Sequence, residues 1–175
     1  AIDAASSGDT IYLCAYLDYQ ITTALDLDGK DVAIQGAGAS STVLDGGGTA
    51  RILFSSGDIV VAGLTMQHAH HGAAGGAIAG DSVTISASRF VSNSAGGGGG
   101  AVHADGVARV TASEFVGNEA ASGGALYAFD AATVTASTFT DNEATFGGAI
   151  YAFYDATISG SRFAGNHAWS GGAIM

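Results

Sequence analysis

The sequence repeats itself every 24 residues over its C-terminal two-thirds, and this period limits the folds that the chain can adopt. Pairs of glycines recur at this interval, and each pair is followed by an alanine and an aliphatic residue. The pairs begin at Gly75, Gly99, Gly123, Gly147 and Gly171. A fixed period of this length is typical of solenoid proteins, in which each repeat packs only against its neighbours.

Three further sets of residues follow the period, with one interval of 25 residues in each, and they indicate what fills the interior. Bulky apolar residues occupy one position, aliphatic residues another, and an asparagine follows each phenylalanine by three residues. The sets are Met66, Phe90, Phe115, Phe139 and Phe163; Val61, Ile85, Val110, Val134 and Ile158; and Asn93, Asn118, Asn142 and Asn166, with Ala69 where the first repeat would carry its asparagine.

The segments that carry these residues are short, rich in β-branched and aromatic residues, and separated by Gly, Asn and Asp, which predicts strands rather than helices. We therefore predict an all-β fold: a right-handed parallel β-helix with about 24 residues and three short strands per coil. Neighbouring coils would lie about 4.8 Å apart, so equivalent residues should form ladders. We expect the apolar ladders to point inward, and the asparagine ladder to hydrogen-bond from coil to coil at a turn.

Residues 1–175 are expected to form a single β-helix domain. Residues 61–175 carry the regular repeats, whereas residues 1–60 are less regular and predict opening coils or an N-terminal cap. Roughly six to seven coils would give a rod about 30 Å long. The one cysteine, Cys14, lies in the apolar run IYLCAYL and is expected to be a small buried residue.

The charge balance excludes several partners. The formal net charge is −11, with only five Lys and Arg residues, so we expect no nucleic-acid partner, which would need a basic stripe. The longest apolar stretches, such as residues 59–64, are too short to span a bilayer, so we expect no membrane insertion by this segment.

The sequence does not place acidic and basic residues in a pattern that predicts a catalytic site. Polysaccharide hydrolases on this fold need paired carboxylates on adjacent coils, and no such pair with a base can be assembled. Acids recur after each Gly-Gly strand and predict a stacked, solvated negative edge, with a weak calcium edge as the alternative: Asp81, Asp105, Asp130 and Asp155.

A second candidate is the histidine cluster of His68, His70 and His71, because closely spaced histidines can bind a transition metal. No acid or cysteine lies in that turn, so a variable turn is the favoured interpretation. We therefore predict no catalytic residue, no metal ligand and no cofactor, and expect that the chain is not an enzyme.

The aromatic residues of two neighbouring repeats predict a contact surface. If Leu126 and Ile150 point inward, strand alternation turns their neighbours outward. The candidate surface consists of Tyr127, Phe129, Tyr151, Phe153 and Tyr154. Exposed aromatic clusters usually mark a binding surface, here for a sugar, a partner protein or a second copy. The alternative is that a bend turns some of these rings inward.

The combination of FxxN with GGAI resembles the polymorphic outer-membrane protein repeat. The matching segments are FVGNEAASGGALYA, FTDNEATFGGAIYA and FAGNHAWSGGAI, with FVSNSAGGGGGAV as a looser copy. Members of that family are autotransported or surface-anchored passengers. The resemblance therefore implies a cell-surface, secreted or outer-membrane-associated location, with a role in adhesion or as a stalk.

These observations predict a non-catalytic, extracellular structural or adhesive module of a bacterial surface or secreted protein. Its expected partners are a host or cell-surface protein, a glycan, or the chain itself. The sequence ends at GGAIM within a coil, so either the protein continues or another subunit continues the stack. The alternative function is thus a subunit of a fibre assembled end to end through open β-helix ends. A polysaccharide-active enzyme is the least favoured hypothesis.

Overall fold

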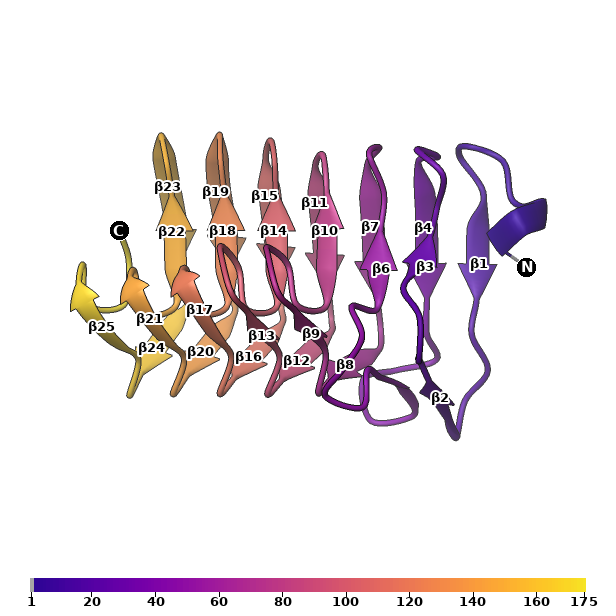
Figure 1. Cartoon of the computed structure of the whole chain (residues 1–175), viewed down its shortest axis with the longest axis horizontal. Helices are drawn as coiled ribbons and strands as arrows, with labels where there is room; N and C mark the ends of the chain where they lie inside the picture. Colours follow the sequence, from indigo (N-terminus) through magenta and orange to yellow (C-terminus); the bar gives the residue numbers. More distant parts are fainter. Residues whose placement is uncertain (1) are drawn as a thin grey trace.

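Successive coils of the chain stack side by side along one axis, and each coil adds one strand to each of several parallel sheets (Figure 1). The computed structural model describes residues 2–175. Sheets A and B each contain seven strands, sheet C six and sheet D five. The predicted all-β parallel β-helix, with a coil of about 24 residues, is confirmed.

The strands of each sheet recur in the order of the coils. Sheet A contains β1 (Thr10–Tyr12), β4 (Val32–Gln35), β7 (Ile59–Ala62), β11 (Val83–Ser86), β15 (Ala108–Thr111), β19 (Ala131–Thr135) and β23 (Asp155–Ser159). Sheet B contains β2 (Leu17–Gln20), β5 (Thr42–Asp45), β8 (Thr65–Gln67), β12 (Arg89–Val91), β16 (Glu114–Val116), β20 (Thr138–Thr140) and β24 (Arg162–Ala164).

The two shorter sheets close the coil. Sheet C contains β3 (Leu25–Asp26), β6 (Leu53–Phe54), β10 (Ile78–Gly80), β14 (Val102–Ala104), β18 (Leu126–Ala128) and β22 (Ile150–Ala152). Sheet D contains β9 (His70–His71), β13 (Ser94–Ala95), β17 (Glu119–Ser122), β21 (Glu143–Phe146) and β25 (His167–Ser170). A short 3-10 helix, η1 (Ile2–Ala4), precedes the first strand. Between Ile2 and Met175 no helix is long and apolar enough to cross a membrane.

Sheet D is a fourth wall that the sequence did not predict. The opening coils have three strands, as expected, but each coil from β9 onward has a fourth strand between sheets B and C. These residues follow the position of the FxxN asparagine and were expected to lie in a turn. They form strands that pair from coil to coil, as β17 and β21 show by pairing Ala120 with Ala144.

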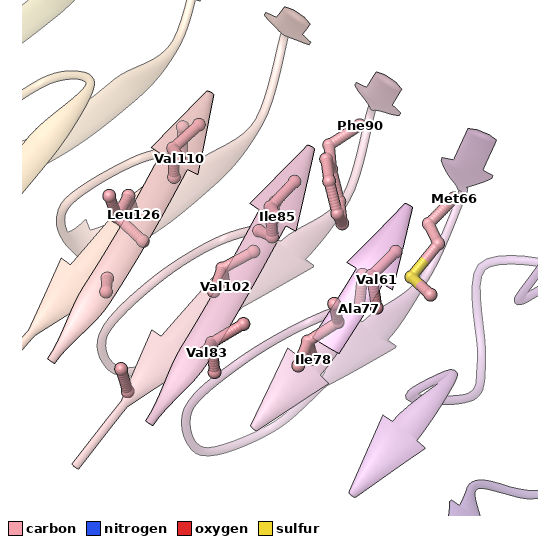
Figure 2. Close-up of a cluster of buried hydrophobic side chains, with 14 of the residues drawn as sticks. Val61, Met66, Ala77, Ile78, Val83, Ile85, Phe90, Val102, Val110 and Leu126 are labelled. Carbon is pink, nitrogen blue, oxygen red and sulfur yellow. The ribbon is translucent and has the colours of Figure 1, made fainter. Parts of the chain in front are cut away.

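The core is built from side chains that point inward from all coils. Figure 2 shows Val61, Ile85 and Val110 on successive strands of sheet A, facing Ile78, Val102 and Leu126 on sheet C. All six are buried. Burial alternates along the strands, as in β7, where Ile59 and Val61 are buried and their neighbours are not. Burial in sheet A therefore alternates with every residue, because one face of the sheet packs against the core and the other faces solvent.

The phenylalanine ladder packs into the core from the middle of the sheet B strands. The rings of Phe90 and Phe115 stack with centroids 4.8 Å apart, and those of Phe115 and Phe139 with centroids 4.7 Å apart. Phe163 continues the stack at 5.0 Å. Met66 lies beneath Phe90 in the same register and starts the ladder. The predicted inward stack is thus present in every regular coil.

The asparagine ladder is buried at Asn93, Asn118 and Asn142, and its members hydrogen-bond from coil to coil. The Nδ2 of Asn118 donates to the Phe90 carbonyl oxygen at 3.1 Å and to Asn142 Oδ1 at 2.9 Å. Its Oδ1 accepts from the backbone N–H of Asn93 and from Asn93 Nδ2, both at 3.0 Å. The four hydrogen-bonding positions of the amide are therefore satisfied. The ladder ends at Ala69, whose N–H donates to Asn93 Oδ1.

A second buried polar ladder was missed by the sequence analysis. Serines at the corner between sheets A and B each donate a hydrogen bond to a carbonyl oxygen two residues back and accept one from a backbone N–H one coil earlier. That N–H belongs to Leu64 for the first serine and to the preceding serine for the others: Ser88, Ser113, Ser137 and Ser161. Their spacing matches that of the phenylalanines. This shared spacing was the signal that the sequence offered for the serine ladder.

The two glycines of the first four Gly-Gly pairs, which begin at residues 75, 99, 123 and 147, have different roles. Gly123 adopts a φ of 60°, in the left-handed region that side chains disfavour. Gly124 has no such constraint, but a Cβ atom there would overlap the carbonyl oxygen of Gly148 in the next coil. The pair thus combines a sharp corner with a close approach of backbones, and no other residue type meets both conditions.

The expectation that Cys14 is buried is wrong. Its side chain is exposed, and its backbone N–H donates to the Tyr19 hydroxyl at 3.1 Å. Cys14 lies beyond the end of β1, where Ile11 and Leu13 are the residues turned toward the core. Alternation places Cys14, which follows Leu13, on the outside of the coil.

Candidate contact surface

Two coils of sheet C and the turns that follow them present the aromatic residues. β18 and β22 pair in register, so Tyr127 lies directly beside Tyr151 and Leu126 beside Ile150. Leu126 and Ile150 are fully buried, which turns both tyrosines outward, where they are half-buried. Beyond the strands, Phe129, Phe153 and Tyr154 are 44%, 52% and 66% exposed. We call these five residues the aromatic surface.

The rings of the aromatic surface stack on each other. Tyr127 and Tyr151 lie parallel with centroids 5.2 Å apart, and Phe129 and Phe153 at 5.1 Å. Tyr154 meets Phe153 edge to face, with centroids 5.1 Å apart and planes at 77°. Because the solenoid stacks rings face to face, the surface offers mainly ring edges and phenol groups to solvent.

His103 belongs to the same column, and sequence analysis did not include it. Its ring stacks on Tyr127 with centroids 4.8 Å apart, so both faces of Tyr127 are covered. His103 Nε2 lies 3.2 Å from Asp105 Oδ1, while Nδ1 is buried without a partner in the described residues. Burial, with Tyr151 and Asp105 nearby, raises the pKa of the Tyr127 phenol. The 24-residue interval between His103 and Tyr127 was the available signal.

The predicted ladder of four acids is wrong for its last two members. Gly80, Ala104, Ala128 and Ala152 pair in register, so the residues that follow them share one column: Asp81, Asp105, Phe129 and Phe153. Asp155 pairs with Ala131 instead of Asp130. The acids recur at 25 residues in these coils while the coil repeats at 24. The negative edge therefore gives way to phenylalanine where the aromatic surface begins.

The three clustered histidines have separate partners. His68 Nδ1 lies 3.1 Å from Asp45 Oδ2, His70 Nδ1 lies 2.9 Å from Ser94 Oγ, and His71 Nδ1 accepts from Arg51. Asp45 comes from the preceding coil, so an acid does lie beside the cluster, although none lies in its turn. Burial alone would raise the pKa of Asp45, but hydrogen bonds from Gln67, the Gly47 N–H and His68 outweigh it and lower that pKa. In residues 2–175 no three such side chains converge as metal ligands.

His71 should make stability depend on pH. Burial and the nearby charges of Arg51 and His70 lower the pKa of His71, against a hydrogen bond with Ala74 that raises it. The unfolded chain then binds this proton at higher pH than the folded chain does. The stabilising contribution is complete above the ordinary pKa of 6.5 and is lost as pH falls through the folded pKa.

Urea denaturation between pH 5 and pH 8 checks this prediction. We expect the free energy of unfolding to fall toward acid less steeply in His71→Asn than in the natural chain. One proton sets the upper limit of this difference at about 1.4 kcal/mol per pH unit. Identical pH dependence of the two chains would contradict the prediction.

The structure also places two carboxylates in a pair that sequence analysis did not assemble. β17 and β21 put Glu119 and Glu143 in register on adjacent coils, and His167 follows on β25. The pair was missed because these residues were expected to lie in a turn. All three side chains are exposed. A carboxyl that acts as a general acid near neutral pH is held in an apolar pocket, whereas Glu119, Glu143 and His167 line a recess of about 290 Å³ in which all three stay exposed.

Comparison with known protein families gives a match to a short segment of the chain. The family model of the Chlamydia polymorphic membrane protein repeat matches residues 136–152. These residues contain one FxxN motif and the Gly-Gly corner after it, from β20 to β22. The match confirms the resemblance found in the sequence. Neither the curated proteins nor the solved structures gave a match to the chain.

Proposed function

We propose that this β-solenoid, which carries a polymorphic membrane protein repeat, is a non-catalytic adhesive module displayed at the surface of a bacterial cell or secreted from it. The fold and the repeat fit a surface structural module. Fully paired buried ladders make a rigid rod suited to holding a binding surface away from a cell.

The observation that carries the adhesive role is the aromatic surface. Five aromatic side chains of two coils gather on one side of an otherwise acidic rod, and three of them are more than 40% exposed. A monomeric rod gains nothing from exposing them, whereas aromatic residues are enriched where proteins bind proteins. Ring edges and phenol groups suit a protein partner better than a sugar, because both faces of Tyr127 are already covered.

Cell binding by the fluorescently labelled chain tests this proposal. The variant Phe153→Ser/Tyr154→Ser removes two exposed rings while leaving the buried ladders intact. We expect it to weaken binding about tenfold or more, as the loss of an interface hot spot does. The control is Trp169→Ser, which removes a ring that is 89% exposed on sheet D.

The outcomes separate the possible partners. Binding that is lost after protease treatment of the cells supports a protein partner, whereas loss only after glycosidase treatment points to a glycan. Equal binding by the natural chain, the double variant and the control variant would contradict an adhesive role of this surface.

The alternative function is a fibre subunit. Half-buried apolar side chains occur in both terminal coils, including Ile11 and Leu13 in one and Phe163 and Ile174 in the other. These surfaces could pair head to tail in a continuous stack. Light scattering with electron microscopy across concentrations distinguishes a fibre subunit from a monomer. Rods longer than about 30 Å would support the fibre, and a monomer at all concentrations would contradict it.

A further inference from the structure

A recess lies where sheet D begins. β9 is the terminal strand of that sheet, and the coils before it have turns instead of a fourth strand. The space beside this free edge is about 490 Å³ and is lined by the turns of the two preceding coils, with Thr22, Thr23 and Thr49, and by Arg51, His70 and His71. It lies apart from the aromatic surface, at the opposite end of the regular coils (Figure 1).

Arg51 is the central cation of this recess. Its Nε donates to the Gly75 carbonyl oxygen at 2.9 Å, and one terminal nitrogen donates to the Ala74 carbonyl oxygen and to His71 Nδ1. The Phe54 ring lies 5.4 Å from the guanidinium carbon. These contacts fix the guanidinium and leave its other terminal nitrogen without a protein partner in the described chain.

No carboxylate of residues 2–175 lies within ion-pair distance of Arg51. Arg89 shows the contrast, because its Nε lies 2.8 Å from Glu114 Oε2. Arg51 is half-buried and thus carries a fixed positive charge with no counter-charge, in a chain whose net charge is −11. Desolvation makes such a charge costly unless an anion accompanies it.

The groups around Arg51 match the needs of an oxyanion. The free terminal nitrogen of Arg51 retains two N–H donors, and a hydrogen bond from it to a carboxylate or sulfate oxygen would be charge-assisted. Two imidazoles and three threonine hydroxyls supply further donors around the same space. The one carboxylate in the lining is Asp26, whose Oδ1 accepts from the Asp28 N–H.

We propose that the recess between β9 and the turns of the two preceding coils binds the carboxylate or sulfate group of a small ligand, with Arg51 as the main contact. The site is independent of the adhesive role, since it shares no residue with the aromatic surface. The structural alternative is that Arg51 only holds the turn of residues 73–75.

Titrations followed by amide chemical shifts test the proposal. Sodium sulfate, sodium acetate and sodium glucuronate are added at constant ionic strength, with sodium chloride and glucose as controls. We expect saturable shifts confined to residues 22–26, 49–54 and 70–75 for the oxyanions and none for the controls. Tighter binding of glucuronate than of acetate identifies an acidic sugar, and equal affinities identify a free oxyanion.

Variants distinguish binding from a structural role. Arg51→Gln should weaken binding about tenfold or more, because it removes a charge-assisted contact. Asp26→Asn does not affect the turn of residues 73–75 and should tighten binding severalfold, because it removes a negative charge from the lining of the recess. The control variant Arg89→Gln should leave the affinity unchanged. If Arg51→Gln alters the fold, the affinity of Asp26→Asn still shows whether the recess binds the oxyanion. Shifts that do not saturate, or an affinity insensitive to Asp26→Asn, would overturn the proposal.

Discussion

Replacing Phe115 by alanine is expected to lower the free energy of unfolding by about 3–5 kcal/mol. Its ring is fully buried and stacks on Phe90 on one side and on Phe139 on the other. The neighbouring coils cannot close the resulting cavity, because hydrogen bonds to both sides fix their spacing. Urea denaturation followed by circular dichroism measures the loss.

The matched control for this prediction is Phe163→Ala. Phe163 is only half-buried and stacks on one ring, that of Phe139. Its removal should therefore cost clearly less than the removal of Phe115. Equal losses for the two variants would show that the buried stack contributes no more than ordinary burial of a ring at the end of the rod.

Replacing Asn118 by alanine is expected to have an effect of similar size, although the residue is polar. The change deprives the Asn93 N–H of its acceptor and the Phe90 carbonyl oxygen of the Nδ2 donor. Asn118 is fully buried, so water cannot replace these partners. Each group left unpaired costs about 1–3 kcal/mol. The same denaturation experiment measures the change.

Asn166 provides the comparison at the end of the ladder. It is half-buried, and its Oδ1 and Nδ2 bond only to Asn142 and to the Phe139 carbonyl oxygen. We expect Asn166→Ala to be milder than Asn118→Ala, because solvent reaches the groups that it leaves behind. A larger loss at position 166 than at position 118 would be incompatible with a ladder stabilised by burial.

The fold was predictable because identical positions stack on one another. Once the 24-residue period is seen, each ladder of like residues specifies which coils are neighbours, and alternation specifies which side chains point inward. The same logic found the phenylalanine and asparagine ladders. It failed for sheet D, because the strands after Asn118 and Asn142 have no apolar ladder of their own beyond alanine.

Parts of the candidate sites depend on register and on contacts between coils, which residue spacing alone does not give. Asp130 and Asp155 looked equivalent in sequence, but a one-residue difference in spacing removes them from the acidic column. Asp45 reaches His68 from the preceding coil. The outward direction of Tyr127 and Phe129 followed from alternation, whereas the covering of Tyr127 by His103 needed coordinates.

The asparagine ladder also has a direction. From Asn93 to Asn166, each Nδ2 donates to the Oδ1 of the following coil, so all amide dipoles in the line point the same way. A whole coil can therefore be deleted or duplicated without reversing any bond: the amide before the change meets an equivalent amide after it. Rod length is then adjustable in steps of one coil, about 4.8 Å, and genes that gain or lose one repeat still encode a continuous ladder.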